Sequence, residues 1–315
     1  MRTKIGIAML SAAVGVAAWA EVSAEKPGSS AAQPPPGAEE EASITARLVA
    51  NTTAVVPGRD LLLGVHLTMS DGWHTYWKNP GAAGLATDVT WQLPDGFRAG
   101  PLRWPVPIRF TSPGPITSFG YAGEVMLLTH IHAPEGLGDR TDVTLQAKVS
   151  WLGCKDVCVP GEATVGLTLP VAAKAEPANA DLFRVWRERL PRPPGNDAHQ
   201  VDVRIERSGH RQGGGTYTIT LTWPAPVRDV QWFPDPGAAL KVSDVKIATR
   251  GPSAVLSFAA RPLKGVRLDR DTMESVVAYA DGSGRRRGVR IDVPLVASKK
   301  PEPAGPDGVR PDGAP

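Results

Sequence analysis

The alternation of apolar and polar residues is most regular in segment 142–152. The apolar positions are Val143, Leu145, Ala147, Val149 and Trp151, and the polar positions between them are Thr144, Gln146, Lys148 and Ser150. Because successive side chains of a β-strand point to opposite faces, this pattern predicts an antiparallel strand that is buried on one face. A less regular alternation predicts another strand at 124–132.

Shorter segments of the same kind predict the remaining strands. In the first half of the chain they lie at 44–50, 60–68, 86–93 and 163–169, and in the second half at 201–206, 216–223, 228–233, 240–248, 253–259, 274–280 and 288–296. The 33 Gly and 31 Pro residues separate these segments with turn signals. Regular short strands between turns are typical of sandwiches, so we expect an all-β protein with two β-sandwich domains, at 43–172 and 199–297.

One segment, 178–190, departs from the strand period. Its apolar residues are spaced as on one face of a helix, with arginines and a glutamate between them. Asp181 is a candidate N-cap, and Pro191 ends the pattern. The sequence therefore predicts a short amphipathic helix within a linker at 173–198.

The two ends of the chain differ from the strand-rich middle. Two basic residues precede the apolar run Ile5–Trp19, and the small-x-small sequence at 18–20 suits cleavage by a signal peptidase. The run is shorter than the roughly 20 residues that span a bilayer. We therefore expect a signal peptide at 1–20 and a soluble mature protein in the periplasm. Segments 21–42 and 298–315 are rich in Pro, Gly and charged residues, and are expected to be disordered.

Charge and short motifs exclude several classes of function. The net charge of +3 is too small to indicate nucleic-acid binding, and the arginine cluster 285–287 is flanked by Gly, which is typical of a turn. There is no Gly-x-Ser-x-Gly elbow, no His-Glu-x-x-His pair and no glycine-rich phosphate loop after a strand. A hydrolase or a nucleotide-dependent enzyme is therefore disfavoured, and neither a metal nor an organic cofactor is expected.

The chain has two cysteines, Cys154 and Cys158, directly after the clearest predicted strand. In an oxidising compartment, two cysteines this close together usually form a disulfide. Three interpretations remain open. The disulfide can be a structural staple, although a loop this short contributes only about 2 kcal/mol in the loop-entropy model. It can instead exchange with other thiols, since short-loop disulfides that are exposed are the reducible ones. Lys155 would favour the thiolate and Asp156 would oppose it.

A metal site is the third interpretation. The cysteines together with Met126, His130 or His132 offer the thiolate, thioether and imidazole ligands that suit Cu(I). However, the chain has no second cysteine pair, and zinc sites usually show four closely spaced ligands. Thiol–disulfide exchange is therefore the favoured interpretation, with copper handling as an alternative.

Six motifs in order carry a resemblance to a known family. They are Gly72–Gly81 (GWHTYWKNPG), Gly84-Leu85 with Trp91, Leu93–Phe97 (LPDGF), Trp104–Pro107 (WPVP), Gly120–Val125 (GYAGEV) and Trp151–Pro160 (WLGCKDVCVP). In these motifs, residues 45–170 resemble the N-terminal periplasmic domain of the thiol:disulfide interchange protein DsbD family. The likeness is greatest to the branch associated with suppression of copper sensitivity, in which a second β domain, here 199–297, often follows.

The resemblance implies an immunoglobulin-like sandwich whose single cysteine pair relays electrons. Cys154 and Cys158 match that pair in position, and we expect Cys158 to be the exposed sulfur. The implied partners are a membrane-embedded thiol donor and periplasmic thioredoxin-like or disulfide-isomerase proteins. Because the chain shows no multi-helix membrane segment, the donor is expected to be a separate protein. The alternative is a non-catalytic adaptor that binds copper or protein and uses the disulfide as a staple.

The family also shields its disulfide with an aromatic cap loop before the strand that begins here at Glu124. Phe119 and Tyr121 are the matching cap candidates, and Phe110 is a weaker one. The motif that contains His74, Tyr76 and Trp77 is interpreted either as core packing or as an edge for docking a partner.

Overall fold

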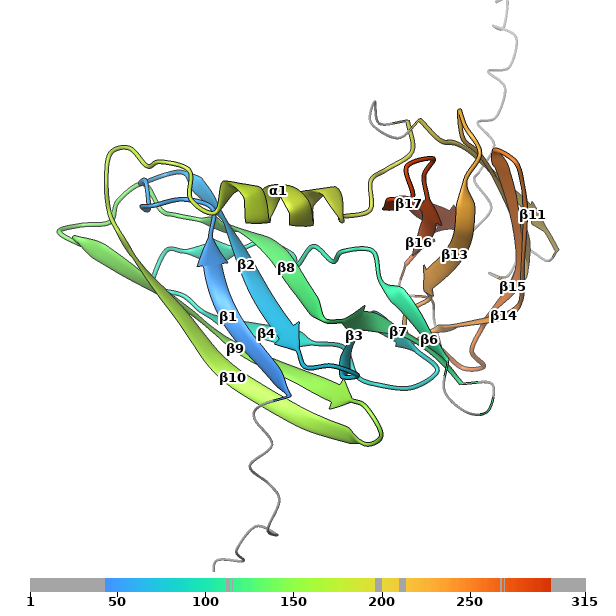
Figure 1. The fold of residues 1–315 in the computed structure, drawn as a ribbon, viewed down its shortest axis with the longest axis horizontal. Coiled ribbons are helices and arrows are strands. Elements are labelled where there is room, and N and C mark those ends of the chain that lie inside the picture. Colours follow the sequence, from blue (N-terminus) through green and yellow to red (C-terminus); the bar gives the residue numbers. More distant parts are fainter. Residues whose placement is uncertain are drawn as a thin grey trace, which may run out of the picture. The chain divides into compact units, whose positions relative to one another are not determined.

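Nearly all regular structure in the computed structural model is β-strand, arranged as two sandwiches (Figure 1). The structure describes residues 43–111, 114, 116–195, 200–209, 214–266, 268 and 270–295. The expected signal peptide at 1–20, the leader at 21–42 and the tail at 298–315 lie outside the described residues. The expectation of an all-β protein with immunoglobulin-like sandwiches is confirmed.

The first sandwich consists of two antiparallel sheets. One has the order β1 (Ile44–Ala50), β2 (Asp60–Met69), β8 (Glu124–His132) and β5 (Arg98–Ala99). The other has the order β10 (Cys158–Pro170), β9 (Asp142–Cys154), β3 (His74–Gly81), β7 (Thr117–Ala122) and β6 (Ile108–Thr111), with β4 (Asp88–Gln92) also paired to β9. Apolar side chains of both sheets form one core between them. Each sheet therefore has an apolar face that points toward the other sheet.

Strand β9 confirms the prediction made for 142–152. Val143, Leu145, Ala147 and Val149 are buried, while the residues between them are exposed. The strand continues two residues further than predicted, to Cys154, and pairs along its whole length with β10 (Figure 1). This long hairpin holds both cysteines.

The second sandwich also consists of two antiparallel sheets. One has the order β11 (Asp202–Ser208), β12 (Gly215–Thr222), β15 (Ser253–Pro262) and β14 (Leu240–Arg250), and the other has the order β13 (Arg228–Asp235), β16 (Thr272–Ala280) and β17 (Arg286–Pro294). Its core is built around aromatic residues: the rings of Tyr217 and Phe258 stack with centroids 5.1 Å apart, and Trp232 packs against Phe258.

The predicted linker helix is present as α1 (Ala180–Glu188). It begins after Asn179, which has a left-handed backbone (φ 52°), so the predicted N-cap at Asp181 is wrong. The side chain of Asn179 does not cap the helix, because its amide donates to the Ala50 carbonyl oxygen at 2.9 Å. Phe183 and Trp186 form the buried face of α1, which fastens the linker to the first sandwich.

The two sandwiches share part of a core. Phe233, Val276 and Ala278 of the second sandwich belong to the hydrophobic cluster that fills the first. The described residues between Ser43 and Leu295 accordingly belong to one compact unit. Among the described residues, no helix has the length and apolar character needed to cross a membrane.

Candidate functional site

The disulfide between Cys154 and Cys158 closes the end of the β9–β10 hairpin. The two cysteines are direct cross-strand partners, with Cα atoms 4.1 Å apart, and three residues form the loop between them. The Lys155 backbone N–H donates to the Val157 carbonyl oxygen at 3.2 Å inside this loop. Because the strand ladder already aligns the hairpin as far as the Pro170–Asp142 pair, the fold does not depend on the disulfide for its register.

The two cysteines differ in their access to solvent. Cys154 is 3% exposed, whereas Cys158 lies in the exposed stretch that continues through the loop. Val157 and Val159, on either side of Cys158, are 68% and 48% exposed. Of the two cysteines, Cys158 is therefore the residue that is open to solvent.

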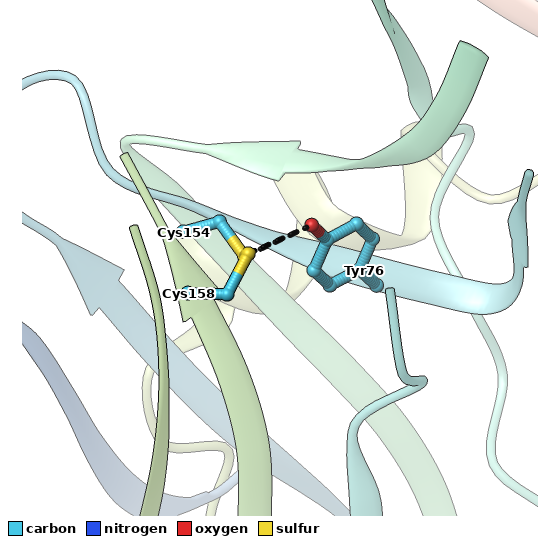
Figure 2. Close-up of a disulfide and its surroundings, with 3 residues drawn as sticks. All are labelled: Tyr76, Cys154 and Cys158. Atoms are coloured by element: carbon cyan, nitrogen blue, oxygen red, sulfur yellow. Dashed lines mark hydrogen bonds between the residues drawn. A yellow bond between two sulfur atoms is a disulfide. The ribbon is translucent and has the colours of Figure 1, made fainter. Parts of the chain in front are cut away.

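The hydroxyl of Tyr76 points at the disulfide from strand β3 (Figure 2). It donates a hydrogen bond to the Cys154 Sγ at 3.0 Å and lies 3.8 Å from the Cys158 Sγ. Tyr76 is only 3% exposed, and burial raises the pKa of its hydroxyl, so the group remains a protonated donor at neutral pH. The Tyr76 ring packs directly against the backbone of Gly84. The φ of Gly84 is +106°, and a Cβ atom at this position would overlap the ring.

His74 continues an aromatic row that leads to the disulfide. It is the cross-strand partner of Cys154, its ring contacts the Tyr76 ring edge-on at 5.4 Å, and it stacks on Phe110 at 4.3 Å. Burial lowers the pKa of His74, so the ring is neutral at pH 7. The row Phe110–His74–Tyr76 therefore ends at the buried Cys154. The neutral imidazole of His74 lies on the neighbouring strand, and the Tyr76 hydroxyl donates to the Cys154 sulfur.

The predicted aromatic residues fall into two groups, because successive side chains of a strand point to opposite faces of the sheet. Gly120 pairs with Tyr76, so its neighbours Phe119 and Tyr121 point to the opposite face of the sheet, into the core. The Tyr121 hydroxyl donates to the Pro105 carbonyl oxygen at 2.8 Å. The structure thus does not bring Phe119 or Tyr121 to the disulfide. Phe110, the weaker of the three cap candidates, reaches the site through its stacking on His74.

The same alternation of faces separates the residues of the Gly72–Gly81 motif. His74 and Tyr76 share the face that carries the disulfide, whereas Trp77 is 1% exposed in the core on the other face. The contact between Tyr76 and Cys154 was not predicted from the sequence. Its only sequence signal is that both residues lie in the family-like motifs, because a pairing across 78 positions leaves no local pattern.

The side chains considered as copper ligands lie on a different sheet from the cysteines. Met126, His130 and His132 belong to β8, in which Met126 is fully buried and His132 Nδ1 contacts Asp60 Oδ1 at 2.8 Å. In the part of the chain that the structure describes, no group of three or more His, Cys, Asp or Glu side chains is arranged to hold a metal ion.

Comparison with known proteins supports the assignment of the first sandwich. Residues 45–170 match the family model described as the N-terminal domain of the thiol:disulfide interchange protein DsbD. No curated protein matches the chain. The first sandwich is thus a DsbD N-terminal-like domain.

A solved structure supports the same fold. The N-terminal periplasmic domain of ScsB from Proteus mirabilis matches with a TM-score of 0.55 at 18% identity, covering 82% of this chain and 96% of that chain. This coverage extends well beyond residues 45–170, so the fold likeness includes the second sandwich. A YadV chaperone and a marsupial T cell receptor also match, each with a TM-score of 0.20 at 10% identity. They cover 78% of this chain and, respectively, 99% and 100% of their own chains.

Proposed function

We propose that this DsbD N-terminal-like domain carries out thiol–disulfide interchange in the periplasm, relaying electrons through Cys154 and Cys158 from a membrane-embedded thiol donor to periplasmic partner proteins. The observation that carries the proposal is the asymmetry of the bond: Cys158 is exposed, and Cys154 is buried with its sulfur hydrogen-bonded by Tyr76. A staple needs no such difference between its two sulfurs, whereas exchange requires one sulfur to be attacked and the other to leave.

The reduction of the domain follows from this geometry. A thiolate of the donor attacks the Cys158 Sγ, forming a mixed disulfide while the Cys154–Cys158 bond breaks and Cys154 leaves as a thiolate. Hydrogen bonds to charged groups are stronger than those to neutral ones, so the Tyr76 hydroxyl stabilises the thiolate more than it stabilises the disulfide sulfur. The second thiolate of the donor then attacks the donor's own sulfur, releasing reduced Cys158 and an oxidised donor.

Delivery of the electrons is the same chemistry in reverse. The Cys158 thiolate attacks the disulfide of a periplasmic partner, one partner sulfur leaves as a thiolate, and a mixed disulfide forms. Cys154 then attacks the Cys158 sulfur, the second partner thiolate leaves, and the intramolecular bond is restored. Two electrons pass to the partner in each cycle. Partners of the thioredoxin-like or disulfide-isomerase class, which present an exposed cysteine pair, suit this exchange.

The test uses the full mature chain, reduced beforehand, and measures how fast it reduces the disulfide of a thioredoxin-like protein. Cys158→Ser is expected to abolish reduction, because the attacking sulfur is gone. Cys154→Ser is expected to stop the reaction at a mixed disulfide that is visible on a non-reducing gel. If both single variants reduce the partner at the original rate, the proposal is wrong and the disulfide is a staple.

A further inference from the structure

Strand β3, which carries Tyr76, leaves its partner β7 immediately after that residue. Tyr76 pairs with Gly120, but the next pair along the ladder is Gly81 with Ser118. Four residues of β3 therefore lie opposite the single residue Phe119 of β7, forming a large bulge. Residues 77–80 of β3 are therefore not paired with β7, and their position depends on other contacts.

Three consecutive residues of β13, in the second sandwich, supply those contacts. Phe233 is fully buried and packs edge-on against both Trp77 and Phe119, with ring centroids 6.3 Å and 5.0 Å away. It therefore fills the bulge where the strands separate. The Pro234 carbonyl oxygen accepts a hydrogen bond from the Asn79 side-chain amide at 2.6 Å.

Lys78 completes this connection with two carboxylates. Its Nζ lies 3.1 Å from Asp235 Oδ2 and 2.6 Å from Glu274 Oε1 of β16, and the Lys78 side chain is 23% exposed. Ion pairs that are partly shielded from water are screened less by salt than fully exposed pairs. Phe233, Pro234 and Asp235 together with Glu274 thus hold β3 at the point where its own sheet does not. We name these four residues the β13–β16 clamp.

We propose that the β13–β16 clamp positions Tyr76 against Cys154, so that the second sandwich sets the reactivity of a disulfide in the first. Lys78 follows Tyr76 by two residues on β3. The clamp therefore fixes the strand directly C-terminal to Tyr76. A hydrogen bond weakens steeply as its distance and angle depart from the optimum, so a small shift of β3 changes how well Tyr76 stabilises the Cys154 thiolate. Lys78 and Asn79 are accordingly positioning residues, which do not touch the reacting sulfurs.

This inference rests on the proposed exchange function, and its test uses the full mature chain. Lys78→Met removes the charge while keeping the length of the side chain. Lys148→Met is the matched control, because Lys148 forms a comparable pair with Glu162 (2.9 Å) on the β9–β10 hairpin but lies outside the clamp. The rate of disulfide reduction by dithiothreitol and the pKa of Cys154, in a Cys158→Ser background, are measured for each protein.

Lys78→Met is expected to slow reduction by roughly three- to tenfold, the size of effect that a weakened hydrogen bond produces, and to raise the pKa of Cys154. Lys148→Met is expected to change neither, and Lys78→Arg is expected to restore both. If Lys78→Met lowers the melting temperature but leaves the rate and the pKa unchanged, the clamp is merely structural and the inference is overturned. Asn79→Ala provides the same comparison if Lys78→Met does not fold. A wild-type protein that dithiothreitol does not reduce would instead contradict the proposed function.

Discussion

The hydroxyl of Tyr76 donates a hydrogen bond to the Sγ of Cys154 at 3.0 Å, although the two residues are 78 positions apart in the chain. The β9–β10 hairpin alone would leave both sulfurs in similar surroundings at its tip. The approach of β3 makes them different, because the Tyr76 hydroxyl lies nearer the Cys154 sulfur (3.0 Å) than the Cys158 sulfur (3.8 Å), and Cys154 is buried whereas Cys158 is an exposed residue. In the proposed exchange, this relationship makes Cys158 the attacked sulfur and Cys154 the leaving sulfur.

Replacement of Tyr76 by Phe is expected to raise the pKa of Cys154 and to slow reduction of the disulfide by about tenfold or more. The reason is that a hydrogen bond to a charged group contributes roughly 1.5–3 kcal/mol, and each 1.4 kcal/mol changes a rate about tenfold. The thiolate absorbance of Cys154 in a Cys158→Ser background gives its pKa. Tyr217→Phe, at a buried hydroxyl of the second sandwich, is the control. Equal rates for Tyr76→Phe and the wild type would exclude a role for the hydroxyl.

The unequal exposure of the two cysteines predicts unequal reactivity once the bond is broken. In the Cys154→Ser variant, the remaining Cys158 is expected to react with a small alkylating reagent about tenfold faster than Cys154 does in the Cys158→Ser variant. Access and thiolate fraction together determine such rates. Each rate is therefore measured across a range of pH, which separates the two effects. A faster reaction at Cys154 at every pH would reverse the assigned direction of attack.

Gly84→Ala is expected to displace Tyr76, because the new Cβ atom would overlap its ring. The left-handed backbone at this position adds strain, so the free energy of unfolding should fall by about 1–3 kcal/mol. Gly265→Ala is a matched control, since its φ of +79° carries the same kind of strain while the added Cβ meets open space. Reduction of the disulfide should slow in Gly84→Ala and not in Gly265→Ala. If Gly84→Ala lowers the free energy of unfolding without changing the rate of disulfide reduction, Gly84 has a packing role alone.

His74 predicts a pH dependence of stability. Burial lowers its pKa in the folded state below the ordinary value of 6.5, so the unfolded chain takes up a proton at higher pH than the folded chain does. The contribution of neutral His74 to the free energy of unfolding is therefore fully present above about pH 6.5. This contribution is lost as the pH falls below that value toward the pKa of His74 in the folded state. His74→Gln should show a smaller loss of stability between pH 7 and pH 5 in denaturant titrations. An identical pH dependence in both proteins would contradict this assignment.

The sequence predicted the elements whose side chains alternate between core and solvent. β9 was recognised because its outer face is polar, and α1 because its buried and exposed residues have a helical spacing. β3 was not recognised as a strand, because its second half, 78–81, has the polar and turn-forming residues of a loop and bulges away from β7. Such a segment has no period of two, so local pattern could not identify it.

The site was predicted in part, for a related reason. The pairing of the cysteines and their place next to the clearest strand could be inferred from the sequence, although Cys154 proved to be the last residue of that strand. The faces of the aromatic residues could not, because a shift of one residue in register moves a side chain to the other side of a sheet. Phe119 and Tyr121 flank Gly120 in the family-like motif, yet the pairing of Gly120 with Tyr76 directs both into the core. Contacts made by strand pairing over long separations require the structure.

The reduction potential of the Cys154–Cys158 pair is the most direct test of the account. The purified mature protein is equilibrated in glutathione or dithiothreitol buffers of known potential, and free thiols are trapped and counted. Thioredoxin, glutaredoxins and protein disulfide isomerase have potentials between about −180 and −270 mV, and a value in this range is expected for this pair. A value below about −300 mV, which is typical of structural disulfides, would contradict it.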